Sequence, residues 1–245
     1  MANWSDPRPA ASAFTAPRTG VRTEAYDAGL RRYMLSVYNY MASGVLLTGI
    51  VALLFAESGM AAQVFFAPGP LKYLFIFAPL AFILVLSFGI HRLSTGATQA
   101  AFWAFAAVMG LSMSTIFLVY TGSSIAITFF ATAAAFLSLS LYGYTTKRDL
   151  SGLGTFLIMG VVGLLVASLL NLWFQSPGLN LVISAVGVLL FAGLTAYDTQ
   201  RIKGMYDYVQ GTDMVGKVVI MGALSLYLDF VNMFQFLLSF LGNRE

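Results

Sequence analysis

Cysteine is absent from this 245-residue chain, and histidine occurs only once. The lack of cysteine excludes disulfides, thiolate metal ligands and cysteine nucleophiles. A single histidine excludes any site that needs several histidine ligands from one chain. Charged residues are also scarce, at 9% of the sequence, against about a quarter in a typical soluble domain. These shortages argue against a disulfide-stabilised secreted domain and against an ordinary soluble enzyme, and the net charge of +3 gives no reason to expect a nucleic-acid partner.

Hydrophobic residues make up 59% of the chain and fall into repeated runs of about twenty residues. Runs of this length favour membrane-spanning helices over the alternating pattern of a membrane β-barrel. Short connections, several of them marked by proline or glycine, separate the runs. The expected spans are Met34–Ala56, Leu71–Ile90, Ala100–Tyr120, Ser124–Tyr142, Leu153–Phe174, Leu179–Gln200 and Val218–Leu241. The sequence therefore predicts an all-α integral membrane protein with a seven-helix domain over residues 34–245.

The first 33 residues are polar, arginine-containing and without periodic apolar spacing, so we expect a largely disordered tail. Lysine and arginine are asymmetric across the predicted spans: eleven of the 13 lie in the tail and in the loops on the same side. Because positive residues concentrate on the cytoplasmic side, the N-terminus is predicted to be cytoplasmic. A re-entrant last segment is the alternative to a full seventh span.

Asp229 lies near the middle of the last apolar run. A carboxylate at that depth costs at least a few kcal/mol, so it needs a partner, a water-filled path or a proton. Winding the run as a helix aligns one small and polar side, made of Gly222, Ser225, Asp229, Asn232 and Ser239. This side is expected to face the protein interior or an aqueous cavity, with Ser225 and Asn232 as candidate pathway-lining residues.

Asp198, near the end of the sixth span, is the strongest candidate partner for Asp229, and Thr195 lies on the same side of that helix. Two carboxylates close together in a low dielectric cannot both ionise cheaply, so such a pair shares a proton. It could act as a pH sensor or contact a hard cation such as Ca²⁺. Spacing leaves an alternative open: Asp198 falls near the inner surface, beside Arg201, whereas Asp229 lies about 18 Å of helix rise beyond Lys217.

Three stretches of the chain resemble the Bax inhibitor-1 family of membrane proteins, in its bacterial branch. They are Ser140–Gly152 (SLYGYTTKRDLSG), Gly187–Lys203 (GVLLFAGLTAYDTQRIK) and Ala223–Phe234 (ALSLYLDFVNMF). The resemblance implies a bundle in which the last helix is central and wrapped by the other six, and a location in the bacterial inner membrane. It further implies that Asp198 and Asp229 pair as a pH sensor that gates a calcium leak.

In the closed form of this family, a basic residue at the cytoplasmic end of the second helix engages the acidic pair. The nearest candidates here are Arg92 and its neighbour His91, and we take Arg92 as the candidate gating partner. This region aligns poorly with the family pattern. The second span also contains no acid, although some relatives carry a glutamate there. The expected metal contact is Ca²⁺ on Asp198 and Asp229, as a transported ion and not as a tightly bound cofactor.

Two other functions compete with the leak. One is a regulator that binds another membrane protein, since the resemblance implies association with a membrane-bound, ATP-dependent protease. The other is an intramembrane aspartyl protease, which Tyr227-Leu228-Asp229-Phe230 disfavours because it lacks the glycine-rich approach of those enzymes. We therefore expect no enzymatic activity. The oligomeric state is open, and a monomer is compatible with the sequence.

Overall fold

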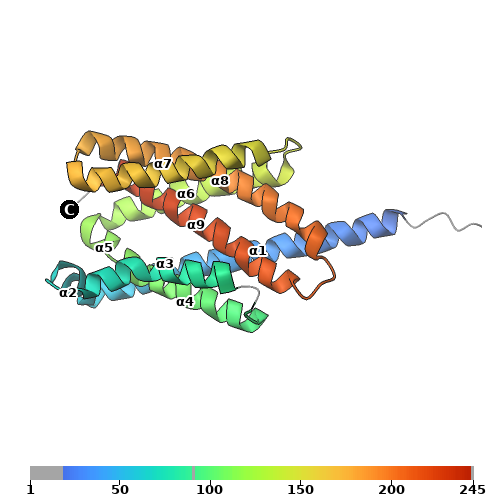
Figure 1. The fold of residues 1–245 in the computed structure, drawn as a ribbon, viewed down its shortest axis with the longest axis horizontal. Helices are drawn as coiled ribbons and strands as arrows, with labels where there is room; N and C mark the ends of the chain where they lie inside the picture. The colour runs from blue at the N-terminus through green and yellow to red at the C-terminus, as the bar shows by residue number, and fades with distance from the viewer. Residues whose placement is uncertain (1–18, 90–91, 244–245) are drawn as a thin grey trace, which may run out of the picture.

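The computed structural model describes residues 19–89 and 92–243, with side chains from Glu24 onward (Figure 1). The described part of the chain is helical almost throughout. Its helices are α1 (Thr19–Glu57), α2 (Met60–Phe66), α3 (Leu71–Gly89), α4 (Thr95–Met113), α5 (Ile116–Val119), α6 (Gly122–Thr145), α7 (Ser151–Phe174), α8 (Pro177–Val209) and α9 (Val215–Leu241).

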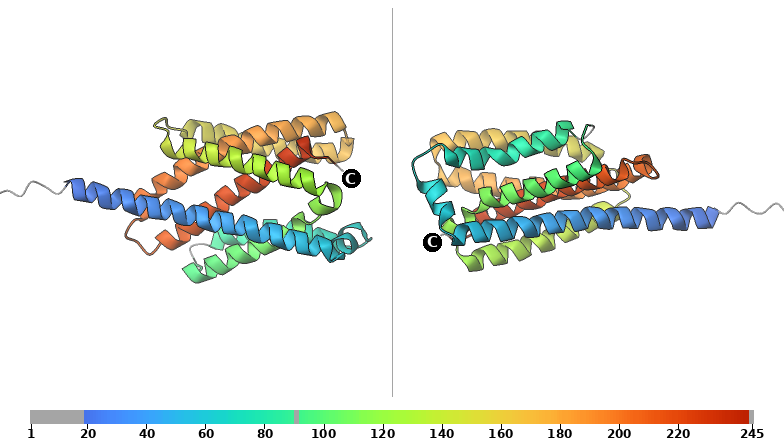
Figure 2. Two further views of the ribbon diagram at one scale, coloured as in Figure 1. Left: turned by 180° about the vertical axis from the view of Figure 1, so that it is seen from behind. Right: turned by 90° about the horizontal axis from the view of Figure 1, so that it is seen from below.

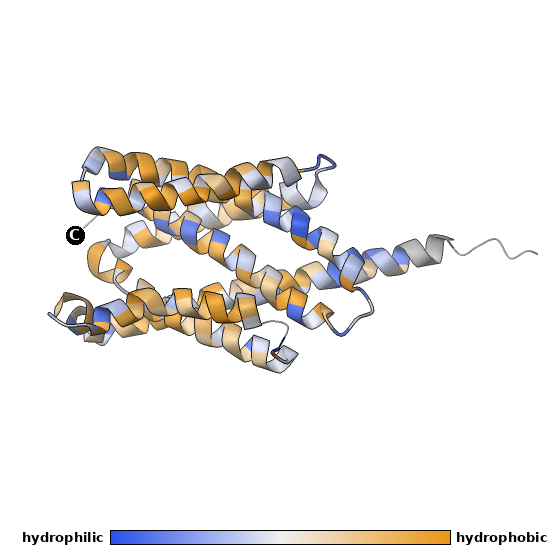
Figure 3. Ribbon diagram, viewed as in Figure 1, coloured by the Kyte–Doolittle hydropathy of each residue, from blue (hydrophilic) through white to orange (hydrophobic). Residues whose placement is uncertain are grey.

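Seven of these segments are long and apolar enough to cross a membrane, which confirms the predicted all-α fold with seven spans. Helices α4 and α5 together form one span, Thr95–Val119, because only a two-residue break at Ser114 and Thr115 separates them. Helix α2 is a seven-residue connection between the first two spans. Hydrophobic residues predominate along the spans (Figure 3), and many large apolar side chains on them are exposed, as expected for helices that contact lipid.

Residues 19–33 differ from the predicted tail because they form the first turns of α1. Tyr26, Leu30, Tyr33 and later Val37 recur at helical spacing, a periodicity that the sequence reading missed. Leu30 and Tyr33 are buried, and the rings of Tyr26 and Tyr33 lie 5.4 and 5.3 Å from that of Tyr206 in α8. The Tyr26 hydroxyl also donates to the Asp207 carboxylate. The prediction for residues 1–18 lies outside the described residues.

The spans form two groups joined by α9. Helices α6, α7 and α8 lie on one side, α1, α3 and α4 lie on the other, and α9 runs obliquely between them (Figures 1 and 2). Helix α9 packs against α1, α4, α6 and α8, whereas α3 packs mainly on α4 and α7 on α8. The last helix is therefore enclosed on four sides, with α3 and α7 forming outer layers.

Helix α9 is continuous over 27 residues, about 40 Å of rise, so it is long enough to cross the membrane fully. It is also the most buried span. Its carboxyl end is tied to α6, since the Asn243 carbonyl accepts from the Thr121 N–H and the Asn243 N–H donates to the Ser124 hydroxyl. These features favour a transmembrane helix over the re-entrant alternative.

A glycine sets the distance between α6 and α8. A Cβ added at Gly143 would lie 2.2 Å from the carbonyl oxygen of Ala196, which is far inside van der Waals contact. Because the obstructing atom is backbone, the two helices would have to separate to accommodate any side chain. Close approach through small residues is the usual way in which membrane helices gain packing contacts. Gly143 therefore fixes the position of the α8 segment that carries Asp198.

We predict that Gly143→Ala destabilises the protein by about 1–3 kcal/mol, because the added methyl group forces α6 away from α8. Gly163→Ala in α7 is the matched control, since a Cβ there meets no atom within 4 Å. Thermal unfolding of the two variants in the same detergent measures the difference. Equal transition temperatures for Gly143→Ala and wild type would contradict the tight contact.

Candidate functional site: a buried pair of carboxylates

Asp198 and Asp229 reach similar depths because α8 and α9 form a helical hairpin. Helix α8 continues to Val209, nine residues beyond the predicted end of the sixth span at Gln200. Asp198 therefore lies about 16 Å of helix rise before the end of α8, and Asp229 about 21 Å after the start of α9. The mismatch in depth that the sequence spacing suggested disappears once the true helix lengths are known.

Asp229 is buried, with only 4% of its surface exposed, and its Oδ2 atom has no hydrogen-bond partner among the described residues. The charge of Asp198 acts directly on Asp229. Asp198 is half-buried. The positive charge of the Arg201 guanidinium, one turn further along α8, attracts its carboxylate. The two predicted acidic residues thus lie on two helices that pack against each other, and the more deeply buried one lacks a full set of partners.

The three predicted pathway-lining residues occupy different environments. Thr195 is fully buried, and its hydroxyl donates to the Phe191 carbonyl at 2.8 Å. Asn232 is half-buried and donates through Nδ2 to the Leu228 carbonyl at 2.8 Å. Ser225, one turn before Asp229, is half-buried as well. Ser225 and Asn232 therefore flank Asp229 along α9, while the hydroxyl proton of Thr195 is used within α8.

Arg92 is not joined to the acidic pair. It lies exposed in the turn after α3, where its N–H donates to the Gly89 carbonyl. No ion pair between Arg92 and either aspartate occurs among the described residues. The adjacent His91 lies outside the described part of the chain. The role of Arg92 as a gating partner accordingly stays a prediction.

The Asp198 segment is anchored by two neighbours that the sequence analysis did not single out. Gln200 accepts from the Leu150 N–H and donates to the Arg148 carbonyl, each at 2.8 Å. Lys203 donates to the Tyr144 carbonyl at 2.8 Å, and its Nζ lies 4.7 Å from the centre of the Tyr144 ring. The α8 segment after Asp198 therefore bonds the α6–α7 connection through Gln200 and the last turn of α6 through Lys203.

Within that connection, Asp149 orders the start of α7. Its carboxylate accepts from the Ser151 N–H at 2.9 Å. Hydrogen bonds from the side chain and then the backbone of Ser151 hold the pKa of the Asp149 carboxyl below its usual range. Asp149 in the charged cluster Lys147-Arg148-Asp149 therefore stabilises the start of α7. The lysine and arginine of this cluster are among the positive residues that predict the orientation in the membrane.

Hydroxyl groups link three helices beside the carboxylate pair. The Tyr38 and Ser140 oxygens lie 2.6 Å apart, the Ser140 and Thr199 oxygens lie 3.0 Å apart, and Thr199 donates to the Thr195 carbonyl. This series joins α1 through α6 to the turn of α8 that carries Asp198. Buried hydroxyls in a membrane protein need such partners because no water is available to them.

A second pair of hydroxyl groups joins α9 to α1 near Asp229. The Tyr227 hydroxyl lies 2.6 Å from the Thr48 hydroxyl, which donates to the Ala106 carbonyl at 2.8 Å. Tyr227 is completely buried and precedes Asp229 by two residues. Helix α9 is therefore held to α1 and α4 next to the carboxylate. The sequence signal for this contact was a tyrosine inside an apolar span, which requires a partner for its hydroxyl.

The oxygen atoms at the site would suit a weakly held cation better than a resident metal. Calcium takes about six to eight oxygen ligands, and two carboxylates supply only part of such a shell. Among the described residues, no group of three or more His, Cys, Asp or Glu side chains is placed to hold a metal ion. Water or backbone oxygens would have to complete the coordination of any ion that contacts the pair.

The fold and the acidic pair define a seven-span membrane protein with two interacting carboxylates between its last two helices. The chain belongs to the Bax inhibitor-1 family: the family described as "Inhibitor of apoptosis-promoting Bax1" matches residues 30–245. This match confirms the resemblance drawn from the sequence motifs.

Bacterial relatives cover nearly the full length. The chain is 47% identical over 220 residues to the inner membrane protein YbhL of Escherichia coli, covering 89% of this chain and 94% of YbhL. It is 46% identical over 228 residues to RP147 of Rickettsia prowazekii, covering 93% of this chain and 96% of that protein. A more distant relative, YrjE of Lactococcus lactis, is 38% identical over 218 residues, 87% of this chain and 92% of the relative.

We predict that Gln200→Leu speeds amide hydrogen exchange at Leu150, because its N–H loses its acceptor and the connection loses a second bond at Arg148. A loss of about 1–2 kcal/mol of local stability corresponds to exchange roughly five- to thirtyfold faster. Gln99→Leu on the exposed face of α4 is the control with the same change of side chain. Unchanged exchange at Leu150 in Gln200→Leu would show that the connection does not depend on this side chain.

Proposed function

We propose that the protein is a pH-sensitive leak for cations, with calcium as the principal ion, and that Asp198 and Asp229 form its gate. The observation that carries the proposal is the buried Asp229 carboxylate, which has an unpartnered oxygen and a second carboxylate acting on it. Such an arrangement is costly in a membrane and is uncommon unless it serves a function. It offers little stability in return, since an apolar residue at the same place would avoid the desolvation cost.

The chemistry of the pair links proton binding to cation attraction. When the pair shares a proton, it carries less negative charge and attracts a cation weakly. When the proton leaves, two negative charges at short range strongly favour a cation over continued burial as bare carboxylates. A divalent ion such as Ca²⁺ matches the charge of the fully ionised pair, and waters would complete its shell.

Asp198 and Arg201 are the charged residues whose action on the pair bears on the pH response. Asp198 of α8 acts on Asp229, and Arg201 of α8 acts on Asp198. From the other helices around α9, Thr48 of α1 forms a neutral hydrogen bond with Tyr227, two residues before Asp229. Two carboxylates in a largely apolar bundle do not both ionise cheaply, so we expect the pair to hold one proton between them. Flux should therefore rise with pH as the shared proton is released.

We infer that the protein is a multi-pass inner-membrane protein with a cytoplasmic N-terminus. The inner-membrane name of the YbhL relative and the seven apolar helices support this placement. The orientation rests on the distribution of lysine and arginine. A membrane-protein partner such as an ATP-dependent protease remains compatible with a leak, and the hypothesis that the protein is not an enzyme stands beside both.

The test is calcium uptake into liposomes that contain the purified protein, measured from about pH 6 to pH 8. A single shared proton that is released across this range should raise flux by roughly five- to tenfold. Asp198→Asn and Asp229→Asn should each flatten the dependence, because one carboxylate alone has no partner with which to share a proton.

Asp213→Asn is the matched control, since Asp213 is an exposed carboxylate in the α8–α9 connection and the substitution changes charge by the same amount. Its pH profile should match that of wild type. If flux is absent, or if both pair variants keep the wild-type profile, the leak hypothesis is wrong and a regulatory role without flux is favoured. Cleavage of a membrane substrate that both pair variants abolish would instead indicate a protease.

A further inference from the structure

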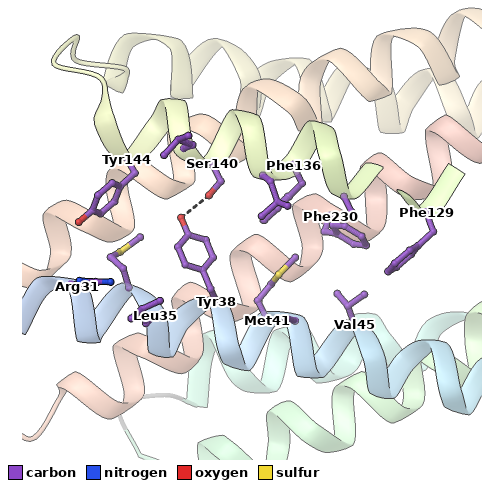
Figure 4. A pocket seen from close by; sticks show the side chains of 15 residues that line it. Arg31, Leu35, Tyr38, Met41, Val45, Phe129, Phe136, Ser140, Tyr144 and Phe230 are labelled. Carbon is purple, nitrogen blue, oxygen red and sulfur yellow. Dashed lines mark hydrogen bonds between the residues drawn. The ribbon is translucent and has the colours of Figure 1, made fainter. Parts of the chain in front are cut away.

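A groove lies between α1 and α6 (Figure 4). These two helices do not pack closely against each other. The groove has a volume of about 620 Å³, and Phe230 of α9 contributes to its wall. A smaller cavity of about 320 Å³ continues along the same two helices and shares Val45, Phe129 and Phe230 with it. Together they form one elongated space beside the last helix.

The groove lies at membrane depth. Its lining from Met34 to Val45 and from Phe129 to Leu141 falls within two membrane-spanning segments. Leu35, Leu137 and Leu141, along its edges, are exposed. In a bilayer these edges face acyl chains, so the groove is accessible from the lipid and not only from water.

The groove is polar at one end and apolar along the rest. Arg31 lies at one end, with Tyr38 and Tyr144 nearby, whereas Met41, Phe129 and other apolar side chains line the remainder (Figure 4). Arg31 is exposed and has no carboxylate within ion-pair distance among the described residues. A guanidinium and phenol hydroxyls suit a phosphate, which forms charge-assisted hydrogen bonds with arginine.

The length of the groove suits one lipid chain that lies along α1. From Arg31 to Val45, α1 rises about 21 Å, which exceeds the hydrocarbon thickness of one leaflet, about 15 Å, by the depth of a headgroup region. A lipid with its phosphate at Arg31 would therefore extend its chain along the apolar part of the groove.

We propose that this groove is a binding site for one anionic phospholipid. The phosphate would lie at Arg31, and one acyl chain would extend between α1 and α6 towards Phe129 and Phe230. The occupant would contact both sides of the carboxylate site, since Ser140 in the groove wall bonds Thr199 and Phe230 follows Asp229 in sequence. The site is independent of the leak, because it requires only a membrane-embedded bundle.

Native mass spectrometry of the detergent-purified protein, titrated with phosphatidylglycerol or with phosphatidylcholine, tests the proposal. Wild type should retain one phosphatidylglycerol in preference to phosphatidylcholine. Arg31→Ala should remove this preference, and Ala133→Trp, which fills the groove, should reduce retention of both lipids at least fivefold. Thermal unfolding should show the same pattern, with added phosphatidylglycerol raising the transition temperature of wild type but not of Ala133→Trp.

Two controls separate the groove from the general surface. Arg32→Ala removes the adjacent cation, and Ala134→Trp adds the same bulk to α6, yet neither residue lines the groove. Both should retain phosphatidylglycerol as wild type does. Equal retention by wild type and Ala133→Trp, equal affinity for the two lipids in wild type, or a dimer mass in place of a lipid adduct would overturn the proposal.

Discussion

The burial of the Asp229 carboxylate constrains the rest of the bundle. A carboxylate at this depth has to be kept from lipid, so the helix that carries it must be covered by other helices. Helix α9 is covered by α1, α4, α6 and α8, and it is the most buried span of the described chain. The two helix groups on either side of α9 have their main common contact through it (Figure 1). The same helix therefore provides both the structural axis and the unusual charge.

The three sequence motifs become one structural unit around this charge. The first motif contains Gly143, which brings α6 against α8. It also contains Tyr144, whose carbonyl accepts from Lys203, and the α6–α7 connection, which Gln200 binds. The second motif carries Asp198 together with those two anchoring residues. The third carries Asp229 and Tyr227, whose hydroxyl is held by Thr48 of α1. The position of the carboxylate pair thus depends on close backbone contact and on hydrogen bonds made by Gln200, Lys203 and Tyr227.

The seven spans and the identity of the acidic pair could be predicted from the sequence, because apolar run length and a charge inside a run are local properties. The proximity of Asp198 and Asp229 could not, since it depends on the nine residues by which α8 extends beyond Gln200. Arg201, Lys203 and Asp207 made that extension look like a loop, although helices commonly continue beyond the membrane. Residues 19–33 were misread because their charged residues obscured the helical spacing of Tyr26, Leu30 and Tyr33. The burial of Tyr33 against Tyr206, far along the chain, could not be predicted from local composition.

The carboxylate pair also explains why a leak is a more reasonable hypothesis than a resident metal site. A stable calcium site gains affinity from several rigid oxygen ligands, whereas this site offers two carboxylates, and no third acidic or histidine side chain is placed to complete a metal site among the described residues. A cation would be attracted by charge but held by few direct ligands, and conduction requires binding that is strong enough for entry yet weak enough for release. The same scarcity of ligands makes the proton an effective competitor, because one shared proton removes a large part of the attraction. In the proposed leak, weak coordination and pH sensitivity would therefore be two consequences of placing only two carboxylates in a largely apolar bundle.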